Sequence, residues 1–131
     1  MKQNGFTLIE LVFVLCIVAI LATIAFPSYQ SHLMKSRRSD AKEALASVQL
    51  AQEKWRGNHD SYADNLADLG ISPNSAAGYY TIQLTPGSSS GTNYEAIATA
   101  VPTGPQASDN CGVLKVTATG FSGDTTCWGL H

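Results

Sequence analysis

The fold of this chain is decided by the stretch Gly5-Phe6-Thr7-Leu8-Ile9-Glu10 and by the uncharged run that follows it, LVFVLCIVAILATIAF from Leu11 to Phe26. Counted from Phe6, the segment has 21 residues and one charge, on Glu10. As an α-helix it would extend about 31 Å, roughly the thickness of the hydrocarbon core of a bilayer. A carboxylate inside such a segment is unfavourable in lipid, so Glu10 needs a physical explanation.

Three interpretations of this segment compete. A secretory signal peptide has a shorter apolar stretch and a small-x-small cleavage site, and Phe26-Pro27-Ser28-Tyr29 is a poor one. A plain membrane anchor fits the length but leaves Glu10 unexplained. It also conflicts with the positive-inside rule, because a basic cluster follows the segment while only Lys2 precedes it. The third interpretation is a helix that rests in the membrane and later leaves it to pack against copies of itself.

The motif GFTLIE, followed directly by this apolar run, resembles the processing motif of type IV prepilins. The resemblance extends over the whole chain. It implies that a membrane aspartyl peptidase cuts between Gly5 and Phe6, and that the same enzyme methylates the new amine of Phe6. Residues 1–5 would be a leader peptide, residues 6–27 a hydrophobic transmembrane and assembly helix, and residues 28–131 a periplasmic globular pilin domain.

Glu10 matches the acidic residue that the family carries near the start of the mature chain. A buried carboxylate needs a partner or a proton, and cleavage creates one new cation, the amine of Phe6. We expect Glu10 to be partly neutralised by that amine within its own chain. In a filament it would instead pair with the Phe6 amine of a neighbour and set the stagger between subunits, as buried polar groups set register in coiled coils.

The resemblance implies a structural subunit of a type IV pilus filament that polymerises through its apolar helix. Its partners would be other pilin subunits, the prepilin peptidase and methyltransferase, and the pilus assembly platform of the inner membrane. Before assembly the chain would cross the bacterial inner membrane once, with its C-terminus in the periplasm. After assembly it would lie in an extracellular pilus. The sequence leaves open whether it is a major or a minor subunit, and whether the pilus serves adhesion, twitching motility or DNA uptake.

After Pro27 the pattern changes to an amphipathic helix over residues 28–56. We expect one long helix, loosened around Thr23 because Pro27 cannot donate to the carbonyl of that residue. Its apolar positions recur at helical spacing and predict a stripe that packs on a sheet, with Trp55 in the core. The stripe consists of Tyr29, Leu33, Ala41, Ala44, Leu45, Val48, Ala51 and Trp55.

Residues 57–78 are expected to form a loop, and residues 79–131 a small antiparallel sheet of three or four strands. Alternation predicts strands over Tyr79–Thr85, Tyr94–Val101 and Val113–Thr119, with the alanines of the second facing inward. A fourth strand is predicted over Thr126–Leu130. One long helix packed on one face of this sheet is an α+β fold, as the pilin resemblance also implies.

The chain has three cysteines. Cys16 is interpreted as a small buried hydrophobic residue of the apolar run. If the C-terminal domain faces an oxidising compartment, Cys111 and Cys127 are expected to form a disulfide, which the resemblance also implies. A metal site would need two more ligands, and His131 is the only nearby histidine. Asp109, Asn110 and Asp124 show no spacing typical of a calcium loop, so no metal is predicted.

The cluster Lys35, Arg37, Arg38 and Lys42 has three interpretations: a solvated helix face near lipid headgroups, a contact with acidic residues of another subunit, or a nucleic-acid patch. Binding of nucleic acid is not expected, because from Gly57 onward one basic residue stands against six acidic ones, a formal charge of −5. A minor pilin acting as DNA receptor or adhesin, and a type II secretion pseudopilin, are the alternatives kept open.

No enzymatic motif is found. The sequence contains no phosphate-binding glycine loop and no nucleophile elbow. His59, Asp60 and Ser61 are adjacent, but no other feature of a hydrolase accompanies them. We therefore predict that the chain is not an enzyme and that it needs no cofactor.

Overall fold

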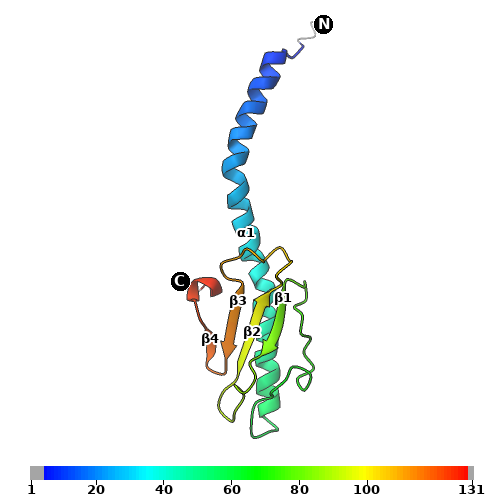
Figure 1. Cartoon of the computed structure of the whole chain (residues 1–131), viewed down its shortest axis with the longest axis vertical. Coiled ribbons are helices and arrows are strands. Elements are labelled where there is room, and N and C mark those ends of the chain that lie inside the picture. The colour runs from blue at the N-terminus through cyan, green and yellow to red at the C-terminus, as the bar shows by residue number, and fades with distance from the viewer. Residues whose placement is uncertain (1–4, 130–131) are drawn as a thin grey trace. The chain divides into compact units, whose positions relative to one another are not determined.

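The structure is a computed structural model that describes residues 5–129 (Figure 1). Its elements follow in the order α1 (Leu8–Arg56), β1 (Tyr80–Leu84), β2 (Glu95–Ala100), β3 (Val113–Thr117), β4 (Gly120–Ser122) and α2 (Thr125–Trp128). The chain divides into two compact units, Met1–Lys35 and Ser36–His131. The second unit holds the sheet and the part of α1 that packs on it, so the predicted α+β fold is confirmed.

α1 is a single helix of 49 residues that continues through Pro27. The proline has no N–H and cannot donate to the carbonyl of Thr23, so one intrahelical hydrogen bond is missing at this turn. The Thr23 hydroxyl donates to the Ile20 carbonyl oxygen at 2.7 Å. The prediction of one long helix rather than two is confirmed.

The inner face of α1 in the second unit is made by Ala41, Leu45, Val48 and Gln52, all fully buried. Gln52 is the unexpected member of this face. Its amide donates to the Ala63 carbonyl at 3.0 Å and accepts from the Ala63 N–H at 2.9 Å, so its polar atoms are satisfied inside the core. The prediction of Trp55 as a core residue is wrong, because its side chain is only half-buried and does not belong to the core cluster.

The four strands form one antiparallel sheet in the order β1-β2-β3-β4. Tyr80, Ile82 and Leu84 of β1 are buried, as their alternation predicts. In β2 the alanine face is the buried one, which confirms the choice made from the sequence. Small side chains there let α1 approach the middle of the sheet closely. The core thus lies between one face of the sheet and the helix.

The C-terminal segment differs from the prediction. The fourth strand is Gly120–Ser122, paired with β3 through a tight connection, and the segment expected to be that strand begins with helix α2. Leu130 lies outside the described residues. The helix forms because Asp124 accepts from the Thr126 N–H as an N-cap, and Gly129 ends the turn with a φ of 72°.

The loop between α1 and β1 is tied to the helix by Asp40. One carboxylate oxygen of Asp40 accepts from the Ser75 hydroxyl at 2.5 Å and from the Tyr79 N–H at 3.3 Å. The other accepts from the Ala77 N–H at 2.9 Å. Together with the partly buried apolar side chains that pack on the core, these bonds fix the chain as it enters β1. Those apolar side chains are Leu66, Leu69 and Ile71.

Candidate functional site

The N-terminus of α1 is closed by reciprocal hydrogen bonds between Thr7 and Glu10. The backbone N–H and the hydroxyl of Thr7 donate to Glu10 Oε2 at 3.2 and 3.0 Å. The Glu10 N–H donates to the Thr7 hydroxyl oxygen at 3.4 Å. This arrangement is a capping box, so Glu10 already has partners within its own chain. Its capping role was not anticipated, although Thr-x-x-Glu before an apolar run is the sequence signature of such a cap.

Gly5 and Phe6 precede α1 in open surroundings. A Cβ added at Gly5 would meet nothing within 4 Å. The side chain of Phe6 is 85% exposed. The described residues therefore leave room for a side chain at position 5.

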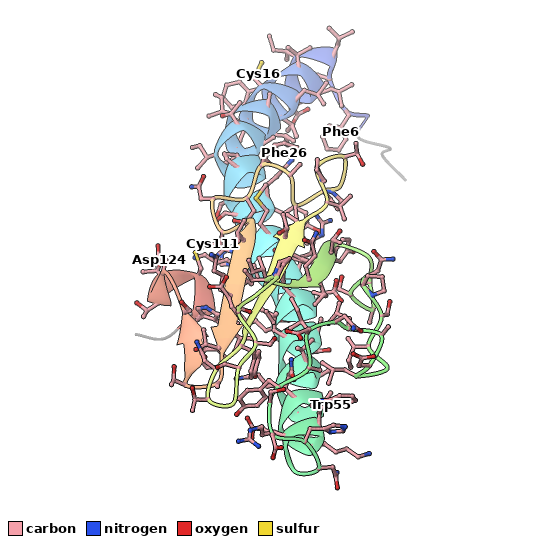
Figure 2. The ribbon with its side chains drawn as sticks, turned by 60° about the horizontal axis from the view of Figure 1, so that its bottom comes forward. Phe6, Cys16, Phe26, Trp55, Cys111 and Asp124 are labelled. Carbon is pink, nitrogen blue, oxygen red and sulfur yellow. A yellow bond between two sulfur atoms is a disulfide. The ribbon has the colours of Figure 1, made fainter. Side chains whose placement is uncertain are left out.

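The N-terminal part of α1 presents an apolar surface. Its large apolar side chains from Leu8 to Phe26 are exposed in the single chain, as Figure 2 shows around Cys16 and Phe26. Within residues 5–129, α1 is the one helix long and apolar enough to cross a membrane by length and composition. Cys16 is exposed as well, so the expectation that it is buried is wrong for the single chain. Such a surface fits membrane anchoring before assembly.

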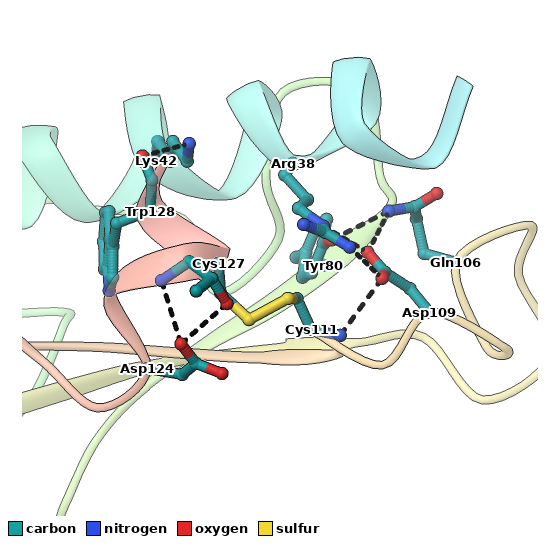
Figure 3. The surroundings of a disulfide bond; sticks show 10 residues. Arg38, Lys42, Tyr80, Gln106, Asp109, Cys111, Asp124, Cys127 and Trp128 are labelled. Atoms are coloured by element: carbon teal, nitrogen blue, oxygen red, sulfur yellow. Dashed lines mark hydrogen bonds and ion pairs between the residues drawn. A yellow bond between two sulfur atoms is a disulfide. The ribbon is translucent and has the colours of Figure 1, made fainter. Parts of the chain in front are cut away.

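The C-terminal segment is fastened by a disulfide between Cys111 and Cys127 (Figure 3). The two Cα atoms lie 5.5 Å apart, within the usual range for a disulfide. Next to it, the Lys42 ammonium donates to the Trp128 carbonyl oxygen at 2.8 Å, which joins α2 to α1. The predicted pairing of these cysteines is present, and the tail after β4 is held at two adjacent points.

A buried ion pair joins α1 to the loop before Cys111. Arg38 donates to both carboxylate oxygens of Asp109, through Nε at 2.7 Å and through a terminal nitrogen at 2.5 Å. Asp109 also accepts from the Gln106 amide at 3.1 Å and the Cys111 N–H at 3.0 Å. The Gln106 amide donates to the Tyr80 hydroxyl as well, at 2.9 Å (Figure 3). One network therefore connects helix, sheet and disulfide loop.

The ionisation of this network follows from its geometry. The hydrogen bonds from Arg38 hold the pKa of Asp109 below its usual value; the Cys111 N–H acts in the same direction, and burial opposes both. The same hydrogen bonds raise the pKa of Arg38 against a smaller opposite effect of burial. Burial is the main cause of a raised pKa at Tyr80. Both members of the pair are therefore charged near neutral pH.

The basic cluster predicted on α1 does not act as one surface. Arg38 forms an ion pair with Asp109, and Lys42 donates to the Trp128 carbonyl oxygen. The Arg37 guanidinium lies 5.3 Å from the centroid of the Tyr79 ring, a cation–π contact. Lys35 is exposed. Two of the four cations thus have structural roles inside the domain, which none of the three interpretations foresaw, because their partners are far away in the sequence.

His59 has a structural role rather than a place in a catalytic triad. Its ring stacks on Trp55 with centroids 3.8 Å apart, and its Nδ1 lies 2.9 Å from the Trp55 carbonyl oxygen. Within residues 5–129 no three His, Cys, Asp or Glu side chains are grouped so as to hold a metal ion. Asp109 is bound to Arg38 and Asp124 caps α2, so the acidic residues considered for calcium are engaged elsewhere.

Comparisons with known proteins agree with the fold. Residues 1–26 match the family model described as the prokaryotic N-terminal methylation motif. Residues 27–115, more than half of the chain, match the family model described as type IV minor pilin ComP, DNA uptake sequence receptor. The second match ends within β3, before β4, α2 and Cys127.

Individual relatives are named as pilins and fimbrial proteins. The chain is 38% identical over 72 residues to the type IV major pilin protein PilA of Myxococcus xanthus strain DK1622, covering 55% of this chain and 33% of that protein. It is 35% identical over 84 residues to a type IV major pilin protein PilE1 of Neisseria gonorrhoeae, covering 63% and 51%. With the fimbrial protein EcpC of Eikenella corrodens it shares 33% identity over 102 residues, covering 78% and 65%. The chain thus spans between a third and about two thirds of the length of these relatives.

Proposed function

We propose that this chain, which belongs to the type IV minor pilin family, is a structural subunit of a type IV pilus. In the filament its α1 would be buried among other subunits. The observation that carries the proposal is the apolar surface along the first half of α1, exposed in the single chain. In a bilayer the acyl chains cover this apolar surface, whereas in water its exposure is unfavourable and it must be covered by other protein. Equivalent helices of neighbouring pilin subunits would cover it.

The chain would reach this state through cleavage between Gly5 and Phe6 by a prepilin peptidase, followed by methylation of the Phe6 amine. Two observations support this step. The first 26 residues match the methylation-motif family, and the described residues leave room for a side chain at position 5. A protease that must fit the backbone into a narrow site would supply a reason for the glycine there. Before assembly the chain would span the inner membrane with its C-terminal domain in the periplasm, where an assembly platform would receive it.

Glu10 would then pair with the Phe6 amine of a neighbouring subunit. The capping box uses Oε2 of the carboxylate, and in the described part of the chain no hydrogen bond reaches Oε1. A free oxygen on an already oriented carboxylate suits a charge-assisted bond to an amine. Burying this pair would fix the stagger between subunits, whereas the apolar contacts around it allow several registers.

The experiment replaces Glu10 by Gln in cells that lack the parent gene, followed by immunoblotting of sheared pili for the variant. Glutamine keeps an oxygen that accepts from Thr7 but loses the charge. We expect the variant to accumulate in the membrane and to be absent from the sheared fraction. Asp64→Asn, at an exposed acidic residue outside the apolar segment, is the matched control and should enter pili normally. Normal entry of Glu10→Gln would refute the role of the charge. Imaging of the deletion strain separates a major subunit, whose loss removes all filaments, from a minor one.

A second candidate function is DNA reception, which the description of the matching family favours. The charge of the domain opposes it. From Gly57 onward the only basic residue is Lys115, whose ammonium lies 3.8 Å from Glu95, and Arg38 is paired with Asp109. A mobility-shift titration of the detergent-solubilised chain against duplex DNA, repeated at several salt concentrations, tests this function. Binding that weakens steeply with salt would establish it; no shift at physiological ionic strength would exclude it.

A further inference from the structure

An apolar groove lies where β4 and α2 meet the outer side of α1. It has a volume of about 330 Å³ and is called the aromatic groove below. Its walls are Lys42, Glu43, Ala46, Gln49, Phe121 and Trp128. All six residues belong to the unit Ser36–His131, so the groove is a feature of one compact body.

The groove exists because the inner, apolar face of the sheet extends to the edge strand β4. Phe121 pairs with the buried Val116, so its side chain points to the face of the sheet that carries α1. β4 is the edge strand, however, and the helix does not cover it. The Phe121 side chain is therefore 56% exposed, although it belongs to the inner face. A large apolar side chain left uncovered at a sheet edge is typical of a contact surface.

The aromatic floor of the groove is preformed. The rings of Phe121 and Trp128 lie 4.2 Å apart at an angle of 31°. Trp128 cannot move away easily, because the preceding residue Cys127 is bound to Cys111 and its own carbonyl accepts from Lys42. Figure 3 shows Trp128 at the end of α2, with its carbonyl group bonded to Lys42 of α1. Rigid, partly exposed aromatic pairs are the kind of site at which binding energy concentrates.

A matching projection is present on the same chain. Among the residues described in this unit, the large hydrophobic side chains left exposed are Leu50, Val113 and Phe121. Leu50 is the most exposed of them, at 75%, and lies on α1 next to Glu53 and Lys54 at helical spacing. A leucine flanked by one acid and one base thus faces outward, while the groove is bordered by Lys42 and Glu43.

We propose that Leu50 of one copy enters the aromatic groove of a second copy. Lys42 of the groove would then face Glu53 of the partner, and Glu43 would face Lys54, so both rims are complementary in a single orientation. The Tyr62 hydroxyl donates to one oxygen of Glu53, which leaves the other for Lys42. Leu50 lies one helical turn after Ala46 of the groove wall, so the projection and the groove border each other on each copy. This inference rests on the proposed function as a filament subunit.

Photo-cross-linking of filaments tests the contact. The reporter is p-benzoylphenylalanine in place of Phe121, so one aromatic residue replaces another. The full chain carrying it is expressed in cells that lack the unsubstituted chain. After irradiation of sheared pili we expect dimers whose adduct maps by mass spectrometry to the peptide around Leu50. The same reporter at Val113, which is 52% exposed on the opposite face of the sheet, is the control and should not label that peptide.

Charge reversal gives a second measurement. Glu43→Lys and Lys54→Glu should each lower the yield of the Phe121 adduct several-fold, and the double variant should restore it, because the two charges are exchanged across the contact. Filaments that form normally but give adducts of the Phe121 reporter elsewhere, or none at all, would overturn the groove contact and leave the filament function intact. Absence of the parent chain from pili would overturn both.

Discussion

Removing the charge of Arg38 is expected to destabilise the globular domain more than any surface substitution. In Arg38→Met a side chain of similar length stays, but Asp109 loses both hydrogen bonds from the guanidinium. The side chains of Arg38 and Asp109 are only 13% and 2% exposed, so water cannot replace the lost partner. Breaking a buried pair in this way costs about 3–5 kcal/mol. In the variant Asp109 still accepts hydrogen bonds from the Gln106 amide and the Cys111 N–H, so we expect a loss of stability near the lower end of this range, about 3 kcal/mol.

Urea unfolding of the detergent-solubilised chain, followed by the fluorescence of Trp55 and Trp128, measures this loss. With a denaturant dependence of about 1.5 kcal/mol per molar, a loss of about 3 kcal/mol lowers the midpoint by about 2 M. Asp109→Asn should cause a loss of similar size, and the double variant should lose clearly less than the sum of the two. Lys35→Met, at an exposed cation without such a partner, is the control. A midpoint unchanged by Arg38→Met, or additive losses in the double variant, would refute the assignment of this pair.

Three further predictions concern ionisation and covalent linkage. Because folding lowers the pKa of Asp109, this carboxylate stabilises the folded chain fully at pH values above its unfolded pKa of about 3.9. That stabilisation is lost as pH falls through the folded pKa. The urea midpoint of the unsubstituted chain should therefore drop in this range, and that of Arg38→Met should drop much less. Burial raises the pKa of Tyr94 to about 12, so the contribution of this tyrosine to folding stability should disappear as pH rises from about 10 to about 12. Titration of absorbance at 295 nm should show fewer ionised tyrosines at pH 11 in the folded than in the urea-unfolded chain. Tyr94→Phe should reduce this difference without removing it, because the pKa values of Tyr62 and Tyr80 are raised as well. Replacing both Cys111 and Cys127 by Ser should cost about 3 kcal/mol, since the bond closes a loop of about 15 residues; an unchanged urea midpoint would contradict that value.

The elements whose pattern repeats locally were predictable from the sequence. The alternation of Tyr80, Ile82 and Leu84 gave the inner face of β1, and the alanines of β2 gave the side that faces the helix. The buried positions Ala41, Leu45 and Val48 follow a helical period. In each case residues two, three or four positions apart share one environment, so a short window contains the whole signal.

The parts that were not predicted depend on distant partners or on competing local signals. Arg38 and Asp109 are separated by 71 positions, and nothing in the sequence near either one reveals the other. Gln52 was missed because its partner Ala63 lies in an irregular loop. In α2 the threonines and Trp128 favour a strand, but Asp124 and Gly129 cap a short helix. A cap at each end and a disulfide outweigh the weak preference of four residues.

In the proposed function, the chain acts as a trimmed subunit whose apolar α1 packs against those of its neighbours. The most direct measurement is the intact mass and N-terminal sequence of the chain recovered from sheared pili. We expect a chain that begins at Phe6, with a methylated amine and without residues 1–5. Recovery of the chain only from the membrane fraction, still carrying its first five residues, would contradict it.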